Sequence, residues 1–463
     1  MPTITVSTTS RTFPPGTTAG QIFDTLFPAR KPRPLAAALK GRARPLTWAP
    51  DADCTLEILD YTQDEGRRVY ERSLRFLFCL AMRRVLPDVR VRMEHSAGYG
   101  LYIEATPPLN EEEIALVQAE MRALQAAELP FTQERWTREE AMAYFAQAGQ
   151  ADTVRLLGFR PYAFFDVYGC GGVYEYFYGD MLPSTAYLDT FALLPHAPGM
   201  VLQMPLPRSP QTVAPVQPRP KLMRAFAESA HWHDILGCRN VADLNDWVAG
   251  QKLREFVRVS EALQEKSIAA IADSIATRGT RAVFISGPSS SGKTTFTHRL
   301  AVQLRVNGLR PVMLSLDNYY RNLEDVPLDE AGLPDLECLD ALDIALISEH
   351  LRALCRGETV MVPRFSFHEN QRKPGGIPMQ VGVDQPILIE GIHGLNPRLS
   401  AAVPREWVFR VYVSALTTLN LDDHNRIRTT DMRLLRRLVR DQQFRHAPFE
   451  ETFAMWPSVR RGE

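Results

Sequence analysis

The segment from Ala282 to Thr295 constrains this chain more than any other part of its sequence. Residues 282–286 predict a short buried strand that runs directly into the pattern G-x-x-x-x-G-K-T, and a helical pattern follows over 296–306. A strand, a glycine-rich loop and a helix in this order place backbone N–H groups and a helix N-terminus around phosphate groups. The segment therefore predicts a nucleoside triphosphate site in an α/β P-loop fold with a parallel sheet.

Each residue type in this loop suits one part of a triphosphate. Lys293 can reach the β- and γ-phosphates, and the Thr294 hydroxyl can bind magnesium. Only seven of the 53 basic residues are lysines, and a compact ammonium fits between two phosphates where a planar guanidinium would fit poorly. The residues predicted to bind ATP are Gly287, Ser289, Ser290, Ser291, Gly292, Lys293, Thr294 and Thr295.

Two later apolar segments deliver acidic residues to the same edge of the predicted sheet. The strand predicted over 311–316 ends at Asp317, and the strand beginning at residue 386 ends at Glu390. Ligands of open α/β sheets bind at the carboxyl ends of the strands, so both acids should lie beside the phosphate loop. We predict that Asp317 is the general base for a substrate hydroxyl and that Glu390, with Thr294, binds Mg²⁺. The alternative for Asp317 is a loop cap without a catalytic role.

A strand predicted over 407–413 precedes a basic helix over 431–441. Guanidinium groups match phosphoryl oxygens, so this helix is predicted to act as a catalytic lid on the transferring phosphate. A solvated basic helix is the alternative. The arginines that recur at three- and four-residue steps, and so share one face, are Arg433, Arg436 or Arg437, and Arg440.

The first half of the chain has an α+β pattern. Segments 4–8 and 55–61 predict strands, and 66–86 predicts an amphipathic helix. A hairpin is predicted across 90–105, and Asn110 is a predicted N-cap.

A proline-rich stretch separates this half from the phosphate-binding region. Six prolines fall within 205–220, which predicts an extended connector that forms neither helix nor ladder. Helices predicted over 222–236 and 241–278 lead from it towards the phosphate loop.

Composition excludes several classes of protein. The chain is 45% hydrophobic and 23% charged, as in ordinary globular proteins. No apolar stretch reaches the roughly 18 residues of a spanning helix, and the first residues do not resemble a signal peptide, so we predict a cytoplasmic protein without a membrane partner. The formal net charge of −1 argues against a nucleic-acid partner. Six scattered cysteines predict neither a disulfide framework nor a zinc cage. The histidines interpreted as packing residues are His95, His231 and His233.

The second half resembles the uridine kinase and phosphoribulokinase family from about residue 281 to residue 463. The matching segments are GPSSSGKTT, LSLDNYY, LDALD, VPRFSF, ILIEGIHGLNP and DMRLLRRLVRD. The resemblance implies an ATP- and Mg²⁺-dependent kinase that phosphorylates a hydroxyl of a small molecule, with a nucleoside such as uridine as the favoured acceptor. It implies that Asp317 is the catalytic base, that Tyr320 lies near the nucleoside and that Glu337 holds the ribose hydroxyls.

The base-recognising segment departs from the family pattern. It reads FSFHEN from Phe365 onward, without straightforward counterparts of the family's pyrimidine-reading Tyr and His. Phe365 is retained as a predicted substrate contact. A sugar or small-alcohol kinase of the phosphoribulokinase type is therefore the alternative to a nucleoside kinase.

The first part of the chain resembles the TGS and editing-type domains of threonyl-tRNA synthetase. The resemblance is carried by the β-rich start and by residues 111–145, which include EMRALQAAELPFTQERWTREEAMAYF. Editing domains hydrolyse mischarged tRNA with a helical H-x-x-x-H and a later C-x-x-x-H. Here these positions are Arg72 and Phe76, then Cys170 and Tyr174, which implies the fold without the zinc and editing chemistry. A tRNA-associated NTPase or regulator is the second alternative.

These patterns divide the chain into five predicted parts. The parts are a small TGS-like β-grasp domain over 1–62, an α+β editing-like domain over 63–204, a Pro-rich linker over 205–221, a helical connector over 222–280 and a P-loop kinase domain over 281–463.

The resemblance also places residue 463 before the last sheet strand of such kinases, which implies C-terminal truncation or natural absence of that strand. Whether the protein forms a homo-oligomer is left open.

Overall fold

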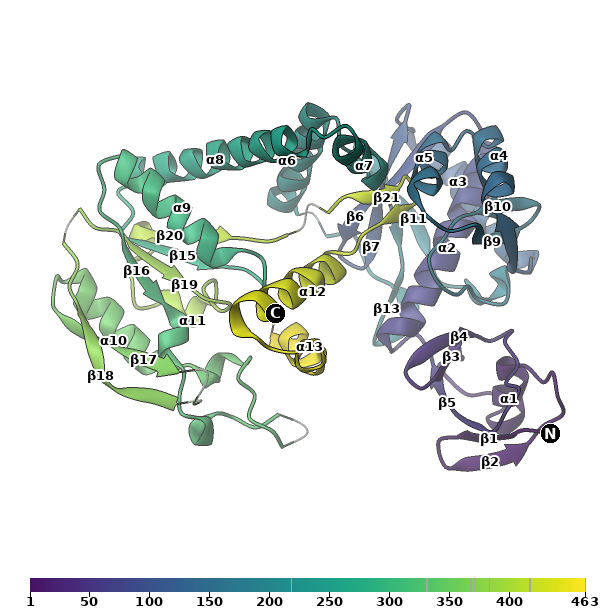
Figure 1. Cartoon of the computed structure of the whole chain (residues 1–463), viewed down its shortest axis with the longest axis horizontal. Coiled ribbons are helices and arrows are strands. Elements are labelled where there is room, and N and C mark those ends of the chain that lie inside the picture. The colour runs from purple at the N-terminus through teal and green to yellow at the C-terminus, as the bar shows by residue number, and fades with distance from the viewer. Residues whose placement is uncertain are drawn as a thin grey trace. The chain divides into compact units, whose positions relative to one another are not determined.

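The computed structural model describes residues 1–217, 219–329, 332–366, 369, 371–382, 384–415 and 418–462. Two compact units make up the chain, and they are drawn in Figure 1. The N-terminal unit comprises Met1–Gly250 together with Leu419–Arg426, and the C-terminal unit comprises Gln251–Thr418 together with Ile427–Glu463.

The N-terminal unit begins with a five-stranded sheet in the order β2-β1-β5-β3-β4. Helix α1 packs on this sheet, because its buried Ile22 and Phe23 join Ile4, Val6 and Leu56 in one apolar core. The predicted strands over 4–8 and 55–61 are present as β1 and β5. The elements are β1 (Thr3–Val6), β2 (Thr9–Thr12), α1 (Ala19–Leu26), β3 (Ala36–Leu39), β4 (Arg42–Pro45) and β5 (Cys54–Leu59).

The next part of the unit is built around α2, whose middle is buried on nearly every side. An antiparallel sheet in the order β11-β12-β7-β6 and helix α3 share its core. The prediction that Asn110 caps a helix is confirmed, since its side chain accepts from the Glu113 N–H in a capping box. The elements are α2 (Asp64–Val85), β6 (Arg90–Ala97), β7 (Gly100–Thr106), α3 (Glu111–Ala126), β11 (Ala192–His196) and β12 (Gly199–Gln203).

A third sheet of the unit has the order β10-β9-β8. Its core is formed with two short helices, α4 and α5. The elements are β8 (Thr132–Thr137), α4 (Arg138–Gln147), α5 (Ala151–Phe159), β9 (Phe164–Cys170) and β10 (Val173–Glu175).

The proline-rich stretch differs from its prediction. Strands β13 (Pro205–Leu206) and β14 (Ser209–Val213) form a two-stranded ladder, so the expectation of a connector without a ladder is wrong over these residues. Both strands lie at an edge, where a residue without an N–H is tolerated.

Three helices follow the ladder: α6 (Pro220–Leu236), α7 (Val241–Ala249) and α8 (Leu253–Thr277). The helix predicted over 241–278 is therefore interrupted. Gln251 has a left-handed φ of 57°, a conformation that does not continue a helix.

A distant segment completes the N-terminal unit. Strands β21 (Asn420–Asp422) and β22 (Asn425–Arg426) form a hairpin inside it, although the predicted kinase domain over 281–463 includes these residues. The Met93 N–H donates to the Asp423 carbonyl at 2.8 Å, and the Asn420 amide donates to the Met93 carbonyl at 2.7 Å. Sequence position therefore does not decide to which unit this hairpin belongs.

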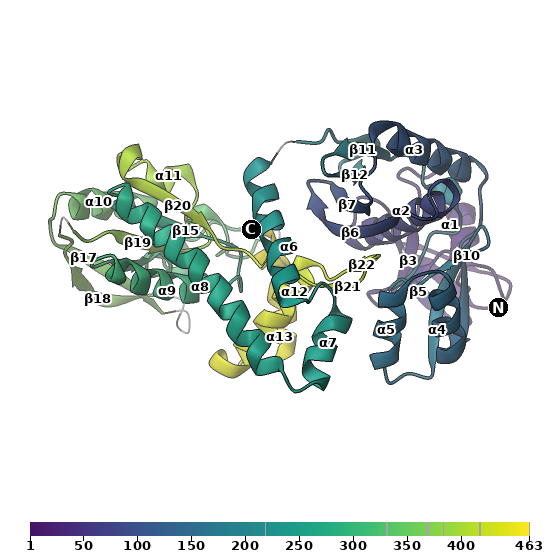
Figure 2. The same ribbon diagram turned by 90° about the horizontal axis from the view of Figure 1, so that it is seen from above.

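The C-terminal unit contains the predicted parallel sheet, in the order β16-β19-β15-β20. Both faces of β15 are buried: Val283 and Ile285 lie in one apolar core with α8 and α9, while Ala282 and Phe284 lie in another with α10. Helices α8 and α9 run side by side on their face of the sheet (Figure 2). The strands are β15 (Ala282–Ser286), β16 (Val312–Ser315), β19 (Ile387–Glu390) and β20 (Val408–Tyr412).

The remaining elements of this unit surround the carboxyl end of the sheet or cover its faces. Strands β17 and β18 form an antiparallel hairpin. None of the helices in the described ranges is long and apolar enough to cross a membrane. The elements are α9 (Lys293–Val306), α10 (Ile344–Cys355), β17 (Val360–Ser366), β18 (Gln371–Met379), α11 (Pro397–Ser400), α12 (Thr429–Arg440) and α13 (Phe449–Gly462).

Candidate functional site

The loop between β15 and α9 requires glycine at both ends of the predicted motif. A Cβ added to Gly287 would lie 1.9 Å from the Val413 carbonyl oxygen, so no larger residue fits there. Gly292 caps α9 with a left-handed φ of 100°. The loop therefore closes tightly and directs the N-terminus of α9 towards its interior, an arrangement that suits phosphate oxygens.

Side chains of the loop add donors to this backbone. The Lys293 ammonium lies over the loop, where it donates to the carbonyls of Gly287 at 2.9 Å and Pro288 at 3.2 Å. The buried hydroxyls of Ser290 and Ser291 have no hydrogen-bond partner among the described residues. An ammonium and two unpartnered hydroxyls in one loop fit a polyanion such as a triphosphate.

Two carboxylates lie beside this loop, as the strand ends predicted. The Thr294 hydroxyl is 3.4 Å from each carboxylate oxygen of Glu390, and the Ser315 hydroxyl is 3.4 Å from one of them. Burial and the nearby charge of Asp317 raise the pKa of Glu390, while Lys293 opposes the shift. Two acids that repel each other beside a hydroxyl group fit a hard divalent cation, so the residues present suit Mg²⁺.

Asp317 lies in the 3₁₀ turn Leu316–Tyr319, directly after β16. Its side chain keeps exposed surface, yet the surrounding protein raises the pKa of Asp317 through desolvation, against the charges of Lys293 and Arg445. A carboxylate with a raised pKa that stays open to solvent can accept a proton from an approaching hydroxyl.

Helix α12 covers the phosphate loop with arginines. Arg433 donates to the Ser289 carbonyl at 3.0 Å, and Arg436 donates to the Ser290 carbonyl at 2.9 Å. Arg437 donates to the Ser289 hydroxyl at 3.0 Å, so both Arg436 and Arg437, which the sequence left as alternatives, contact the loop.

A cavity of about 560 Å³ lies between the loop and α12. Its walls include Lys293 and Thr294 from the loop side and Arg436 and Arg440 from the helix side. Arg440 is paired with Asp441 at 2.7 Å. Part of the predicted ATP-binding loop and two arginines of the predicted lid thus line one open cavity.

The predicted acceptor residues lie next to Asp317. The rings of Tyr320 and Phe365 are 5.5 Å apart. Burial raises the pKa of Tyr320, and the charges of Asp317 and Glu337 add to the shift. The rest of the base-recognising segment, at 367–368 and 370, lies outside the described residues.

Arg372 is a residue of this region that the sequence reasoning missed. Its guanidinium donates to the carbonyls of Tyr320 at 2.8 Å and Tyr319 at 3.1 Å, and it pairs with Asp343 at 3.2 Å. It anchors the turn after Asp317. Its only sequence signal is its position in β18 opposite Phe365, a pairing that becomes visible only in the folded hairpin.

In the N-terminal unit, Arg72 and Phe76 take the helix positions of the absent histidines. Phe76 packs against Phe177 at 5.8 Å. Cys170 and Tyr174, which the sequence reasoning took as the later pair, lie elsewhere: Cys170 is buried in the core, and the Tyr174 ring packs on Trp136. At the helix positions, Phe76 therefore packs among aromatic rings and Arg72 donates to the Asp180 carbonyl.

Residues 283–461 match the model of the Phosphoribulokinase / Uridine kinase family. The C-terminal region is a domain of this family. The match covers the phosphate loop, both acidic strand ends and α12, which confirms the resemblance drawn from the motifs.

The N-terminal 40% of the chain is homologous to threonine–tRNA ligases. It is 29% identical over 189 residues to that of Symbiobacterium thermophilum, covering 40% of this chain and 29% of the relative. It is also 29% identical over 185 residues to threonine–tRNA ligase 1 of Bacillus subtilis, covering 39% and 29%. The chain thus spans about 29% of the length of these relatives. The kinase-family domain and the ligase-like region are joined in one chain.

Among solved structures, a possible uridine kinase from Bacillus stearothermophilus is 20% identical, over 29% of this chain and 70% of that one, with a TM-score of 0.25. That likeness is too low to bear on the acceptor.

For the kinase-family domain, we predict that Arg437→Gln raises the KM for ATP by about tenfold, the effect of losing one charge-assisted hydrogen bond to the loop. Steady-state kinetics with varied ATP checks this value. The matched control is Arg352→Gln, an exposed arginine on α10, which should leave the KM unchanged. If both substitutions changed the KM for ATP equally, the claim that the contact of Arg437 with the loop contributes to ATP affinity would be contradicted.

Proposed function

We propose that this chain is an ATP- and Mg²⁺-dependent kinase that phosphorylates a hydroxyl of a small molecule, with a nucleoside such as uridine as the favoured acceptor. The observation that carries the proposal is the grouping of Asp317, Lys293 and Glu390 at the carboxyl end of one parallel sheet, where the charge of Lys293 lowers the raised pKa values of both acids and Asp317 adds to the rise of Glu390. Membership of the kinase family supports the same reaction class.

In the proposed reaction, the loop and Lys293 hold the triphosphate. Thr294 and Glu390 would hold Mg²⁺, which supplies charge neutralisation on the phosphate oxygens when bound. Asp317 orients the acceptor hydroxyl and takes its proton as the hydroxyl oxygen bonds to the γ-phosphorus, while the bond to the bridging oxygen breaks and ADP leaves.

The arginines of α12 have their proposed role in the same step. Arg433, Arg436 and Arg440 stabilise the negative charge on the γ-phosphoryl group. Arg437 holds the loop itself through Ser289.

A nucleoside is favoured by the surroundings of Asp317. The neighbouring rings of Tyr320 and Phe365 offer apolar surface to a flat base. Glu337 lies close enough to Tyr320 and Arg437 to shift the pKa of both, and its carboxylate can accept from vicinal ribose hydroxyls. A sugar or small-alcohol acceptor would use Glu337 but not the rings, and it remains the competing proposal.

We predict that Glu337→Gln raises the KM for the acceptor by about 10- to 100-fold, because hydrogen bonds to a charged acceptor are replaced by weaker ones. The KM for ATP should change by less than about twofold. Steady-state kinetics with each substrate varied in turn measures both values. Glu349→Gln, an exposed change on α10, is the control. A rise in the KM for ATP instead would contradict the acceptor role.

An ADP-release screen of the purified chain against nucleosides, sugar phosphates and small alcohols tests the proposed function. Uridine or another nucleoside should give the highest kcat/KM. A clear preference for sugar phosphates would move the proposal to a phosphoribulokinase-type reaction.

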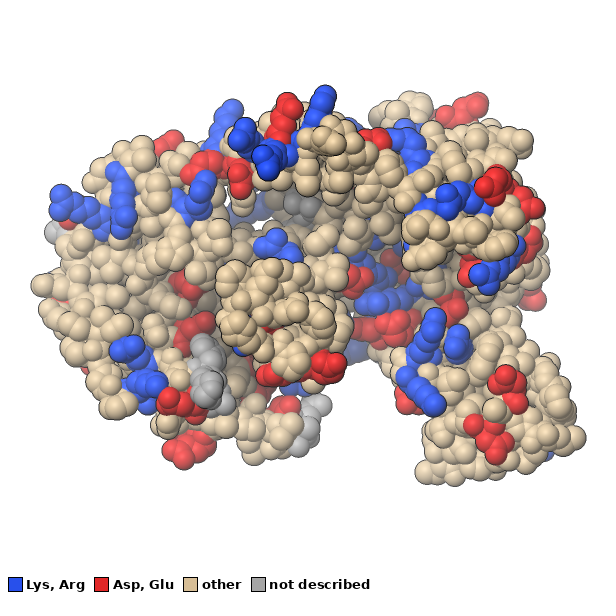
Figure 3. Space-filling model, viewed as in Figure 1, with Lys and Arg blue, Asp and Glu red and all other residues tan. Residues whose placement is uncertain are grey.

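The same screen separates an enzyme from an RNA-associated NTPase. ATP turnover that requires tRNA and no small acceptor would overturn the kinase proposal in favour of that class. Basic and acidic side chains are interspersed over the face drawn in Figure 3, which supports the small-molecule acceptor, since RNA affinity depends on clustered basic residues. The cytoplasmic location and the oligomeric state remain predictions.

A further inference from the structure

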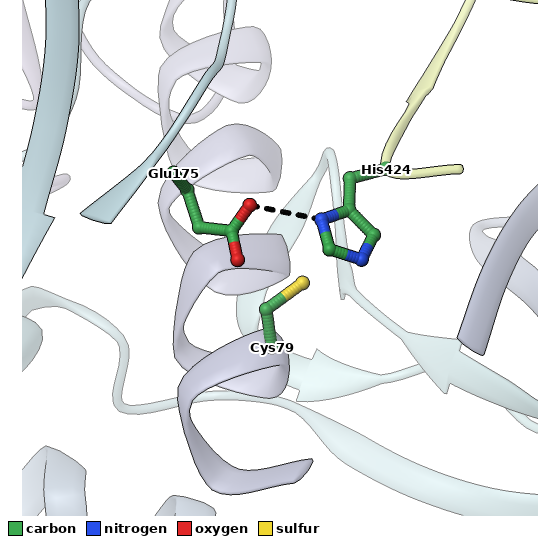
Figure 4. A group of neighbouring side chains, drawn as sticks. All are labelled: Cys79, Glu175 and His424. Atoms are coloured by element: carbon green, nitrogen blue, oxygen red, sulfur yellow. Dashed lines mark hydrogen bonds and ion pairs between the residues drawn. The ribbon is translucent and has the colours of Figure 1, made fainter. Parts of the chain in front are cut away.

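A cluster of metal-ligand side chains lies within the N-terminal unit, apart from the phosphate loop. Cys79 comes from α2, Glu175 from the end of β10 and His424 from the turn between β21 and β22, and Figure 4 shows the three converging. One ligand atom from each lies within 4.8 Å of the other two. Cys79 is 2% exposed and the Glu175 side chain 1% exposed, so these polar groups meet in the interior of the unit and not at its surface.

The carboxylate of Glu175 is fixed by two further side chains. Arg83 pairs with Glu175 Oε1 at 2.6 Å, and the Gln150 amide is 3.0 Å from both carboxylate oxygens. His424 Nδ1 lies 2.9 Å from Glu175 Oε2. Ligating carboxylates in metal sites are themselves hydrogen-bonded in this way, and the outer partners fix their orientation.

The cluster opens on a cavity of about 290 Å³, whose walls include Cys79 and His424. Asp423 and Gln150, which are 6% and 9% exposed, also line it. Asp423 Oδ1 and Gln150 Oε1 are buried and have no hydrogen-bond partner among the described residues. Two buried, unpartnered acceptors that line one cavity point to a ligand that brings hydrogen-bond donors or positive charge.

We propose that Cys79, Glu175 and His424 bind a transition-metal ion of the Zn²⁺ class, with its fourth position open to the cavity. A thiolate, an imidazole and a carboxylate form a ligand set that Zn²⁺ and Co²⁺ accept. Three protein ligands leave one position for water, and the unpartnered oxygens of Asp423 and Gln150 are available to accept its hydrogens. This site is separate from the helix positions of Arg72 and Phe76.

The test uses the full-length protein after removal of metals by a chelator and in the presence of excess Mg²⁺, which occupies oxygen-rich sites. Co²⁺ is the probe, because thiolate ligation gives a near-ultraviolet charge-transfer band and tetrahedral geometry gives visible absorption. The wild-type protein should show both with one equivalent of Co²⁺, and Zn²⁺ should displace them.

Variants assign the ligands. Cys79→Ser should abolish the charge-transfer band, and Cys79→Ser and His424→Gln should each weaken Co²⁺ binding by about 100-fold or more. Cys170→Ser, another buried cysteine of the same unit, should bind like wild type. Thr294→Val should also bind Co²⁺ like wild type, because the proposed site does not involve the phosphate loop. The result therefore does not depend on whether the proposed kinase function is correct.

The absence of a thiolate band in the wild-type protein would overturn the proposal without any variant. A band that survives in Cys79→Ser, or one that is lost in Cys170→Ser, would overturn the assignment of Cys79. Circular dichroism confirms that each variant is folded before its affinity is compared.

Discussion

Replacing Lys293 with alanine is expected to lower kcat for phosphotransfer by about 10³-fold, the loss typical of removing one preorganised charge from the transition state. The ammonium already lies at the mouth of the loop, within 2.9 Å of the Gly287 carbonyl. Its positive charge also opposes the rise that desolvation causes in the pKa values of both Asp317 and Glu390. Initial rates of ADP formation under saturating substrates measure the loss.

Lys266→Ala is the matched control for this prediction. Lys266 is an exposed lysine on α8 in the same unit, and its loss should leave kcat unchanged. A Lys293→Ala protein that is folded and retains more than about a tenth of wild-type kcat would contradict the role of the loop in catalysis.

Asp317→Asn is expected to lower kcat by about 10³-fold, within the range that a positioned general base contributes. ATP binding should be retained, because the loop and α12 hold the triphosphate without Asp317. Isothermal titration with a non-hydrolysable ATP analogue separates binding from turnover. Asp325→Asn, an exposed change nearby in the chain, is the control.

The pH dependence gives a second readout of Asp317. A base must be deprotonated to act, so kcat/KM should rise with pH through the pKa of Asp317, which desolvation places above the usual range for aspartate. Removing this group in Asp317→Asn should abolish the acidic limb along with most of the activity. An acidic limb that persists unchanged in the variant would contradict the assignment.

The sequence predicted the C-terminal unit closely because its information is local. Strand β15 spans the predicted residues, Ala282–Ser286, since a run of apolar residues next to a glycine-rich loop fixes both of its ends. Asp317 follows β16 and Glu390 ends β19, and the parallel pairing of the two strands brings both acids to one edge of the sheet. A motif and a topological rule were therefore sufficient to place Lys293, Asp317 and Glu390 side by side.

What the sequence could not show depends on contacts between distant residues. The hairpin Leu419–Arg426 lies in the N-terminal unit because of hydrogen bonds to Met93, which no local pattern encodes. For the same reason, Cys79, Glu175 and His424 lack any metal-ligand spacing, although they meet in space. Arg437 could not be separated from Arg436, because adjacent helical positions differ only in what they contact.

The acceptor is the other property that sequence and structure leave to experiment. The rings of Tyr320 and Phe365 lie together, but the segment FSFHEN that begins at Phe365 lacks straightforward counterparts of the Tyr and His that the family pattern has for pyrimidine recognition. Recognition of a base needs few residues, and residues in connecting segments vary more readily than those of a core.

The most direct test of the central claim is phosphorus NMR of the purified protein incubated with ATP, Mg²⁺ and uridine. The account predicts stoichiometric conversion of ATP to ADP and a nucleoside monophosphate, dependent on uridine and absent in Asp317→Asn. Release of inorganic phosphate at the same rate with and without uridine, in both proteins, would contradict it.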